Sequence, residues 1–256
     1  MGEVALWRRL AAEFLGSAFL AALVIGSGIA AQRLSPGDTG LELLENAAAT
    51  AAGLFAIILM FGPVSGGHFN PVVSFAAAAF GGVSWRAAAA YLPAQVAGCS
   101  AGAVAANLMF ALPAVTVSAK SRATTAHFLS EVIATLGLIL VIFALARSGR
   151  TRATPAAVGA YIGAAYFFTS SASFANPAIT IGRMFSNTFA GIAPASAPSF
   201  IGAQIAGGAL AVVVVKTLYP GITPGDAADV AVPHAVGAAR EGAVASAAGS
   251  ADRPGD

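Results

Sequence analysis

Charged residues are scarce in this chain of 256 residues. They make up 9% of the sequence, hydrophobic residues make up 57%, and the mean hydropathy is +0.80. Soluble domains contain roughly 25% charged residues, so the composition excludes a water-soluble globular protein and indicates one embedded in a lipid bilayer. Since a helical crossing takes about 20 residues, six crossings and their loops leave no room for a large soluble domain.

Cysteines and dense basic patches are missing as well. Cys99 is the only cysteine, which excludes an internal disulfide and a metal site made of several thiolates. The net charge is only +2, and the Lys and Arg residues are scattered between the hydrophobic runs. A nucleic-acid partner therefore has no surface to bind.

Six hydrophobic runs are predicted to cross the bilayer as helices. They cover about residues 10–31, 47–61, 86–110, 128–146, 153–169 and 200–218. The first run could also be a signal peptide, but its apolar core is longer than usual for one and Glu13 interrupts it, which favours a membrane helix. Residues 221–256 are rich in Ala, Gly, Asp and Pro without a periodic apolar face, so we expect a passive, disordered cytoplasmic tail there.

Two copies of one short phrase stand between these runs, Asn70-Pro71-Val72 and Asn176-Pro177-Ala178. Proline has no donor to lose in the first turn of a helix, and a preceding asparagine can cap free N–H groups, so each phrase predicts a helix start. The helices that follow are too short to cross. A helix that begins at membrane depth is tolerated where its end lines a polar cavity or is buried in protein, and two such ends point to a pore.

The two halves of the chain repeat each other. Glu131 follows Glu13 by 118 residues, the two asparagines lie 106 residues apart, and Gln204 follows Gln95 by 109 residues. Each half has three spans, so the second half must start from the opposite face, which gives an inverted repeat. We therefore expect one membrane domain over residues 1–220, with repeats at about 7–110 and 126–219.

The basic residues predict the orientation. If the N-terminus is cytoplasmic, seven of them lie inside and three outside, which fits the excess of Lys and Arg in cytoplasmic loops. The seven are Arg8, Arg9, Arg86, Arg147, Arg150, Arg152 and Lys216, and the three are Arg33, Lys120 and Arg122. We therefore expect a multi-pass protein of the cell (inner) membrane with both termini in the cytoplasm.

These motifs resemble those of the major intrinsic proteins, the aquaporins and their solute-conducting relatives. The resemblance covers about residues 7–219 and rests on the segment from Ser65 to Val72, the second Asn-Pro phrase, the paired glutamates and the two Ala-Gln segments. It implies an all-α, aquaporin-like bundle of six transmembrane helices and two re-entrant half-helices. It also implies a homotetramer with one pore per subunit.

The pore chemistry is predicted from the two asparagines and the two glutamates. Asn70 and Asn176 can each offer a side-chain N–H to a passing water or hydroxyl, whereas the alternative is that they only cap helices. The positive ends of the two half-helices oppose cations, so protons and ions should be excluded. Glu13 and Glu131 could relay protons, but we favour a supporting role in which they accept backbone N–H groups of the re-entrant loops, as the resemblance also implies for them. Gln95 and Gln204 are assigned to the same support.

The selectivity filter departs from the pattern of water-selective family members, which have an arginine directly after the second motif. Ile179 stands there, and alignment by distance from the asparagines puts Thr50, Ala164 and Ser173 at the other three positions. None of the four is aromatic or charged, so we expect a wider and less polar constriction. Arg183 lies one helical turn beyond Ile179. It could reach back toward the filter, or it could extend to the outer surface or pack between loops.

The sequence thus predicts a passive channel for water and small neutral solutes such as glycerol-like polyols. By analogy with bacterial members linked to arsenic handling, arsenous acid and its methylated forms are further candidates. His68 could line the inner vestibule or serve backbone packing. The competing hypothesis is a secondary transporter with inverted repeats, but that would need titrating or ion-binding groups at the midplane. No enzyme activity, cofactor or metal is expected.

Overall fold

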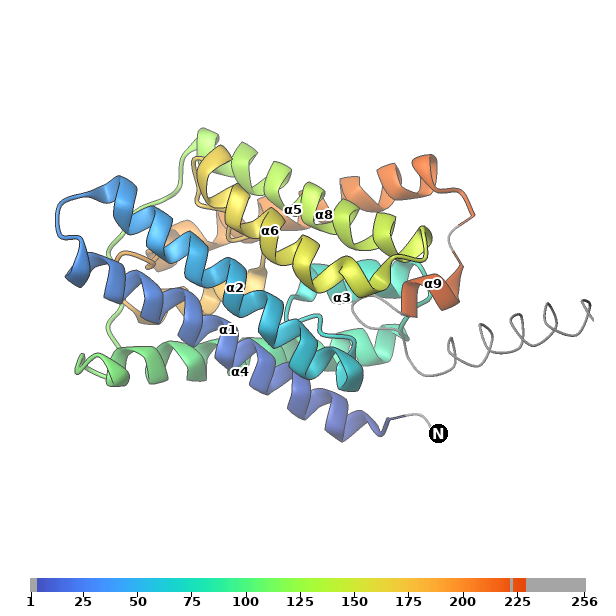
Figure 1. The fold of residues 1–256 in the computed structure, drawn as a ribbon, viewed down its shortest axis with the longest axis horizontal. Helices are drawn as coiled ribbons and strands as arrows, with labels where there is room; N and C mark the ends of the chain where they lie inside the picture. The colour runs from blue at the N-terminus through green and yellow to red at the C-terminus, as the bar shows by residue number, and fades with distance from the viewer. Residues whose placement is uncertain (1–3, 222, 229–256) are drawn as a thin grey trace, which may run out of the picture.

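The computed structural model describes residues 4–221 and 223–228, and every regular element within them is a helix (Figure 1). The first half contains α1 (Leu6–Leu34), α2 (Thr39–Ser65), α3 (Pro71–Ala79) and α4 (Trp85–Met109). The second half contains α5 (Thr125–Arg147), α6 (Thr154–Phe168), α7 (Pro177–Gly182) and α8 (Ala197–Leu218). Short 3-10 turns lie at Thr151–Ala153, Arg183–Phe185 and Pro194–Ser196, and a last helix, α9, covers Pro224–Ala228.

The six long helices correspond to the six predicted spans. Four helical segments are long and apolar enough to cross a membrane, namely α1, α2, α5 and Pro194–Leu218, which includes α8. α4 has 25 residues but is less apolar, and α6 has only 15 residues. α3 and α7, with 9 and 6 residues, are the two short helices that were predicted to begin at the Asn-Pro phrases.

The second span is longer at both ends than predicted. α2 begins at Thr39 because the Asp38 side chain accepts a hydrogen bond from the Leu41 N–H at 3.0 Å, which caps the helix inside the segment expected to be a loop. At the other end Pro63 lies within the last turn rather than after it. The helix stops at Gly66, whose φ of 94° ends it in the left-handed conformation.

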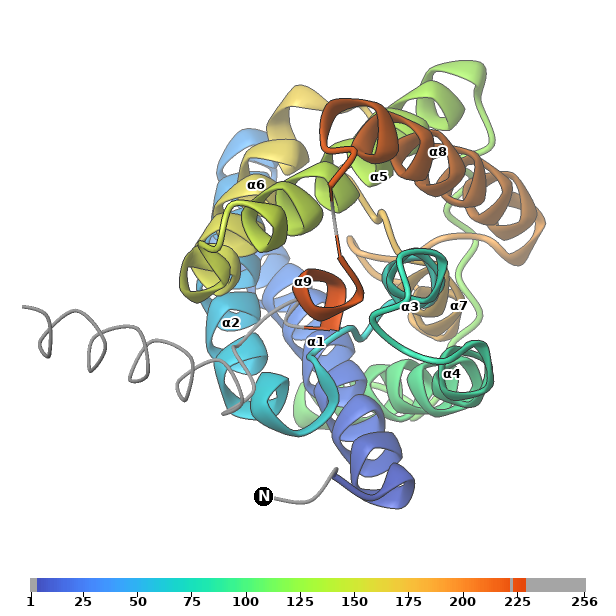
Figure 2. The same cartoon turned by 90° about the vertical axis from the view of Figure 1, so that its right-hand side faces the viewer.

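The same packing scheme occurs in both halves. α1 packs against α2 and α4, and α5 packs correspondingly against α6 and α8, while α2 and α6 join the halves. α3 and α7 each pack against both α4 and α8 (Figure 2). The two half-helices therefore lie inside the bundle, as the inverted repeat requires.

Glycines at equivalent positions let the long helices cross closely. A Cβ atom on Gly98 of α4 would lie 2.2 Å from the carbonyl oxygen of Phe14 on α1. A Cβ atom on Gly207 of α8 would lie 2.4 Å from the carbonyl oxygen of Val132 on α5. Both distances are too short for any side chain, so glycine sets the spacing of the α1–α4 and α5–α8 pairs.

The prediction of a disordered tail is wrong for its first residues. Residues 224–228 form α9 instead of a disordered segment, and α9 packs against α5. The reason is local, because Thr223 and Asp226 cap the first turn of α9 reciprocally. The rest of the predicted tail, residues 229–256, lies outside the described residues.

Candidate functional site

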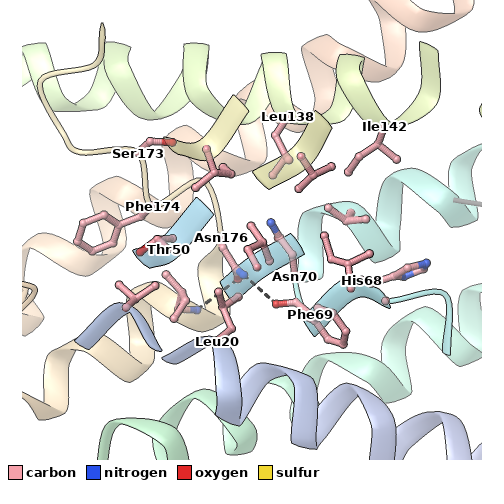
Figure 3. Close-up of a pocket in the computed structure, with 18 of the residues that line it drawn as sticks. Leu20, Thr50, His68, Phe69, Asn70, Leu138, Ile142, Ser173, Phe174 and Asn176 are labelled. Carbon is pink, nitrogen blue, oxygen red and sulfur yellow. Dashed lines mark hydrogen bonds between the residues drawn. The ribbon is translucent and has the colours of Figure 1, made fainter. Parts of the chain in front are cut away.

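The two asparagines cap the half-helices and also join them. Asn70 Oδ1 accepts from the Val72 N–H at 3.0 Å, and Asn176 Oδ1 accepts from the Ala178 N–H at 2.9 Å. Asn70 Nδ2 donates to the carbonyl oxygen of Ala175 at 2.7 Å, and Asn176 Nδ2 donates to that of Phe69 at 2.8 Å (Figure 3). Each amide nitrogen carries two hydrogens. One hydrogen is donated to a carbonyl oxygen of the opposite half of the chain. The other stays available to a molecule in the cavity that both asparagines line.

Pro71 and Pro177 occupy the first positions of α3 and α7, where the missing N–H costs no hydrogen bond. Val72 and Ala178, which complete the two phrases, are buried in the first turns. The side chains of these two residues take no part in the caps, because only their backbone N–H groups donate to the asparagines.

Glu13 holds the first re-entrant segment through both carboxylate oxygens. Oε1 accepts from Ser65 Oγ at 2.6 Å and from the His68 N–H at 3.0 Å. Oε2 accepts from the Phe69 N–H and from Gln95 Nε2, both at 2.7 Å. The carboxylate is fully buried, and it satisfies donors that the non-helical backbone leaves open.

Glu131 repeats this arrangement in the second half. Oε1 accepts from Ser171 Oγ at 2.6 Å and from the Phe174 N–H at 2.9 Å. Oε2 accepts from the Ala175 N–H at 2.8 Å and from Gln204 Nε2 at 2.7 Å. Neither glutamate is among the residues that line the cavity, and the hydrogen bonds of both carboxylates fit the supporting role.

A cavity runs along the half-helix starts, with an empty volume of about 710 Å³ including its open ends. Its walls come from residues spaced every fourth position on four helices, which places them on one face of each helix. These are Leu20 and Val24 on α1, Thr50, Leu54 and Ile58 on α2, Leu138 and Ile142 on α5, and Thr154, Val158, Ile162 and Tyr166 on α6. The asparagines are thus a small polar site within a mostly apolar passage.

Three of the four residues assigned to the filter line this cavity. Thr50, Ser173 and Ile179 do so, whereas Ala164 lies exposed on the far side of α6. Two residues on an α-helix turn the side-chain direction by about 200°, so Ile162 and Tyr166 face the cavity and Ala164 between them cannot. Tyr166 takes the place assigned to Ala164, and its hydroxyl lies 3.2 Å from Thr50 Oγ1.

Arg183 also lines the cavity, which answers the question that the sequence left open. Only 2% of the residue is exposed, and Nε donates to the carbonyl oxygen of Ala190. Its guanidinium carbon lies 3.4 Å from the centre of the Phe174 ring. Arg183 therefore lines the passage rather than extending to the outer surface, and its guanidinium also packs against the loop residues Phe174 and Ala190.

Comparison with known proteins agrees with this geometry. A family model described as "Major intrinsic protein" matches residues 1–175. The chain belongs to the major intrinsic protein family. It is 46% identical over 224 residues to aquaglyceroporin AqpS of Rhizobium meliloti (strain 1021), an alignment that covers 88% of this chain and 95% of that protein. It is 30% identical over 222 residues to aquaporin NIP6-1 of Arabidopsis thaliana, covering 82% and 70% of the two chains.

A solved structure confirms the fold. The aquaglyceroporin from Plasmodium falciparum superposes with a TM-score of 0.66 at 20% identity, covering 85% of this chain and 99% of that one. The chain thus has an aquaporin-like fold, and it is a membrane channel for water and small solutes rather than an enzyme. The alternative of a secondary transporter falls with this assignment.

Several groups at the channel wall were missed from the sequence. Phe174 lines the passage, and a second arginine, Arg122, lies over its ring with the guanidinium carbon 5.2 Å from the centre. The Arg122 guanidinium donates to main-chain carbonyl oxygens of Gly191, Ser171 and Phe189. Arg122 comes from the segment between α4 and α5, which has no periodic pattern, so its spacing could not reveal this contact.

The mouth beside this segment is rich in positive charge. Lys120 Nζ donates to the carbonyl oxygen of Phe189 at 2.9 Å. Partial burial, together with the positive charges of Arg122 and Arg183, lowers the pKa of Lys120 to about 8. The two arginines are the second cause of the shift after burial, and the combined field of the three cationic groups opposes a cation at this mouth.

Polar groups at the remaining wall positions have free hydrogen-bonding capacity. Ser173 Oγ and Thr154 Oγ1 are buried without a hydrogen-bond partner among the described residues, and both residues line the channel. His68 lines it as well, while its Nδ1 lies 3.0 Å from Ser74 Oγ. His68 thus lies at the passage wall, one of the two positions considered for it. No group of three or more metal-ligating side chains occurs within the described residues.

Proposed function

We propose that this channel conducts water and small uncharged polyols such as glycerol, and that it excludes protons and ions. The observation that carries the proposal is a pair of asparagines in an apolar passage, each hydrogen-bonded to a carbonyl oxygen of the opposite half. The residue after the second motif is Ile179 and not arginine. Each asparagine keeps one N–H for a solute hydroxyl. An aliphatic side chain at the next position leaves room for the carbon backbone of a polyol.

The proposed selectivity filter consists of Thr50, Tyr166, Ser173, Ile179 and Arg183. The hydroxyls and the Arg183 guanidinium supply hydrogen bonds, and Ile179 with the Phe174 ring supplies an apolar wall. Arg183 stands one turn further out than an arginine directly after the motif would, so its charge acts further from the asparagines. A solute with hydroxyls on one side and carbon on the other fits such a two-sided wall.

Neutral metalloid hydroxides belong to the same solute class. Arsenous acid and its methylated forms are small, uncharged at neutral pH and carry hydroxyls, so they suit the same donors. The resemblance to bacterial members linked to arsenic handling supports this part of the proposal.

The experiment is a permeability panel in proteoliposomes. Shrinkage and reswelling followed by light scattering should show water and glycerol entering far faster than in empty liposomes, and arsenous acid uptake should rise in parallel. Asn176→Ala, which removes one amide, serves as the matched low-activity variant. Water permeation with glycerol at the rate of empty liposomes would overturn the assignment to polyols.

We further propose that both termini face the cytoplasm and that the channel is a homotetramer in the cell membrane. Because Cys99 is buried, cysteines introduced at exposed Thr39 or Ser148 can be labelled against a low background. An impermeant maleimide should label Thr39→Cys in intact cells, and Ser148→Cys only after lysis. Cross-linking in membranes should stop at four subunits, and the opposite labelling or a monomer would contradict these proposals.

A further inference from the structure

The chain returns to the N-terminal end of the bundle after α8. There α9 lies against the loop that follows α3: a Cβ atom on Gly82 would lie 2.2 Å from the carbonyl oxygen of Ala227. A Cβ atom on Gly81 would lie 3.3 Å from the ring of Pro224. Ala227 is fully buried, whereas Pro224 and Gly225 are exposed, so α9 rests on the end of the bundle through one face.

The position of α9 is central. Figure 2 looks onto the end where α1 begins, and α9 lies in the middle of this end, surrounded by α1, α2, α3 and α5. Figure 1 shows from the side that α9 lies at the end of the bundle, beyond α3. Both views place α9 over the middle of the bundle end.

One apolar layer connects α9 with the channel. The cavity extends along α5 to Ile142, and the next residue, Phe143, packs against Phe80 with ring centres 4.6 Å apart. Phe80, Phe143 and Ala227 all belong to the large buried core of the protein. α9, which packs against α5, therefore lies beside the residues that follow the cavity wall at this end of the bundle.

The position of α9 depends on two local features. A helix of five residues is not stable alone, so its position depends on the close contact with Gly82 and on its cap. In that cap the Thr223 N–H donates to Asp226 Oδ2 at 2.8 Å, and the Asp226 N–H donates to Thr223 Oγ1 at 3.2 Å. Loss of either feature should release the segment without touching the pore.

We propose that α9 is a built-in cover that restricts passage at the N-terminal mouth of the channel, an inference that rests on the proposed function. In the covered state α9 sits on the loop after α3 and on α5, and in the open state it leaves this seat while the six spans stay in place. The chain thereby carries its own inhibitory contact, formed by a segment that sequence patterning assigned to a passive tail.

The first test weakens the cap. Asp226→Ala should raise glycerol and water permeability per reconstituted channel by up to about fivefold, the population shift expected from removing a capping carboxylate. Asp38→Ala is the matched control, since Asp38 caps α2 at the opposite end of the bundle. Equal permeability of Asp226→Ala and the wild type would overturn the proposed cover.

The second test displaces α9 sterically. Gly82→Val forces a side chain into the Ala227 carbonyl and should raise permeability, whereas Gly202→Val, where a Cβ atom meets nothing within 4 Å, should leave it unchanged. A conducting wild type with no gain in either Asp226→Ala or Gly82→Val overturns the cover and leaves the channel assignment standing. Wild type and all variants indistinguishable from empty liposomes would instead overturn the proposed function, and with it the cover.

Discussion

Each buried glutamate has a specific set of donors to satisfy, and this explains why a carboxylate is found there. A carboxylate can only accept, and each of its oxygens meets two donors in Glu13 and in Glu131. An amide at the same place would bring two N–H groups against other N–H groups. Each carboxylate therefore matches the donors of its loop, whose backbone N–H groups are satisfied without water.

The first prediction concerns this match. Glu131→Gln should lower the free energy of unfolding by about 2–4 kcal/mol, because two charge-assisted hydrogen bonds lose their acceptor in a buried site. The midpoint of thermal unfolding in detergent micelles measures the effect. Glu45→Gln is the control, since Glu45 accepts a single hydrogen bond from Ser35. An unfolding midpoint equal to that of the control would contradict the supporting role.

The second prediction concerns Ile179. Ile179→Arg should reduce glycerol flux more than water flux, since the added guanidinium narrows the passage beside Thr50 and Tyr166. Light scattering on one preparation gives both rates. Ile179→Met keeps the volume without the charge and should preserve the ratio of the two. Equal losses of water and glycerol flux in Ile179→Arg would reject the wide filter.

Residue patterning located some of the site and missed the rest for geometric reasons. Asn70, Asn176 and the paired glutamates were found because they recur at matching positions of an internal repeat. Ala164 was misplaced because distance along the chain does not fix the rotational phase of a helix, and Tyr166 faces the channel instead. Phe174 and Arg122 meet only through the folding of long loops, which leaves no local pattern.

At the scale of elements, the two re-entrant segments share a backbone path but not a sequence. In the first, the left-handed positions before the half-helix include Gly66 and Gly67, with φ of 94° and 65°. In the second, the equivalent residues are Ala172 and Ser173, with φ of 59° and 46°. Residues other than glycine carry a steric cost in this region. At these two positions the second segment therefore bears a strain that the first avoids, while Phe69 and Ala175 are left-handed in both.

The third prediction follows from this difference. Gly66→Ala should lower the free energy of unfolding by about 1 kcal/mol, because it introduces the steric cost at φ 94°. Ala172→Gly should leave the stability unchanged or raise it by less than about 1 kcal/mol, since relief of strain is partly offset by chain entropy. Thermal midpoints of the two variants give the comparison. A marked loss of stability in Ala172→Gly would show that the second segment is unstrained.

Elements with a cap or a long apolar run could be predicted, whereas those held by tertiary contacts could not. α3 and α7 were placed by their Asn-Pro starts. α9 escaped because five residues show no periodicity, although Thr223 and Asp226 have the three-residue spacing of a capping box. The start of α2 escaped for a similar reason: the second span was predicted to begin at about residue 47, with Asp38 in the loop before it, whereas Asp38 caps the helix.

The whole molecule opposes cations at two separate levels. Both half-helices begin at the asparagines, so the positive ends of their dipoles meet where Asn70 and Asn176 line the passage. Arg183, Arg122 and Lys120 add positive charge at the mouth beside the loop between α4 and α5. The inverted repeat produces the first level, because two copies of one half-helix can only meet head to head.

The fourth prediction is that the wild type carries no proton current. Proteoliposomes with an internal pH dye and an imposed pH gradient should leak no faster than empty liposomes, while the same vesicles conduct glycerol. Asn176→Asp places a negative charge at the meeting point of the dipoles and removes one donor to the carbonyl of Phe69. It should raise the leak if the electrostatic barrier lies there, whereas Asn187→Asp, in the loop after α7 and away from the channel wall, should not. A wild-type leak above that of empty liposomes would show that the opposed half-helices do not stop protons. The charges at the mouth could not then account for exclusion, because water would still connect the two sides past the asparagines.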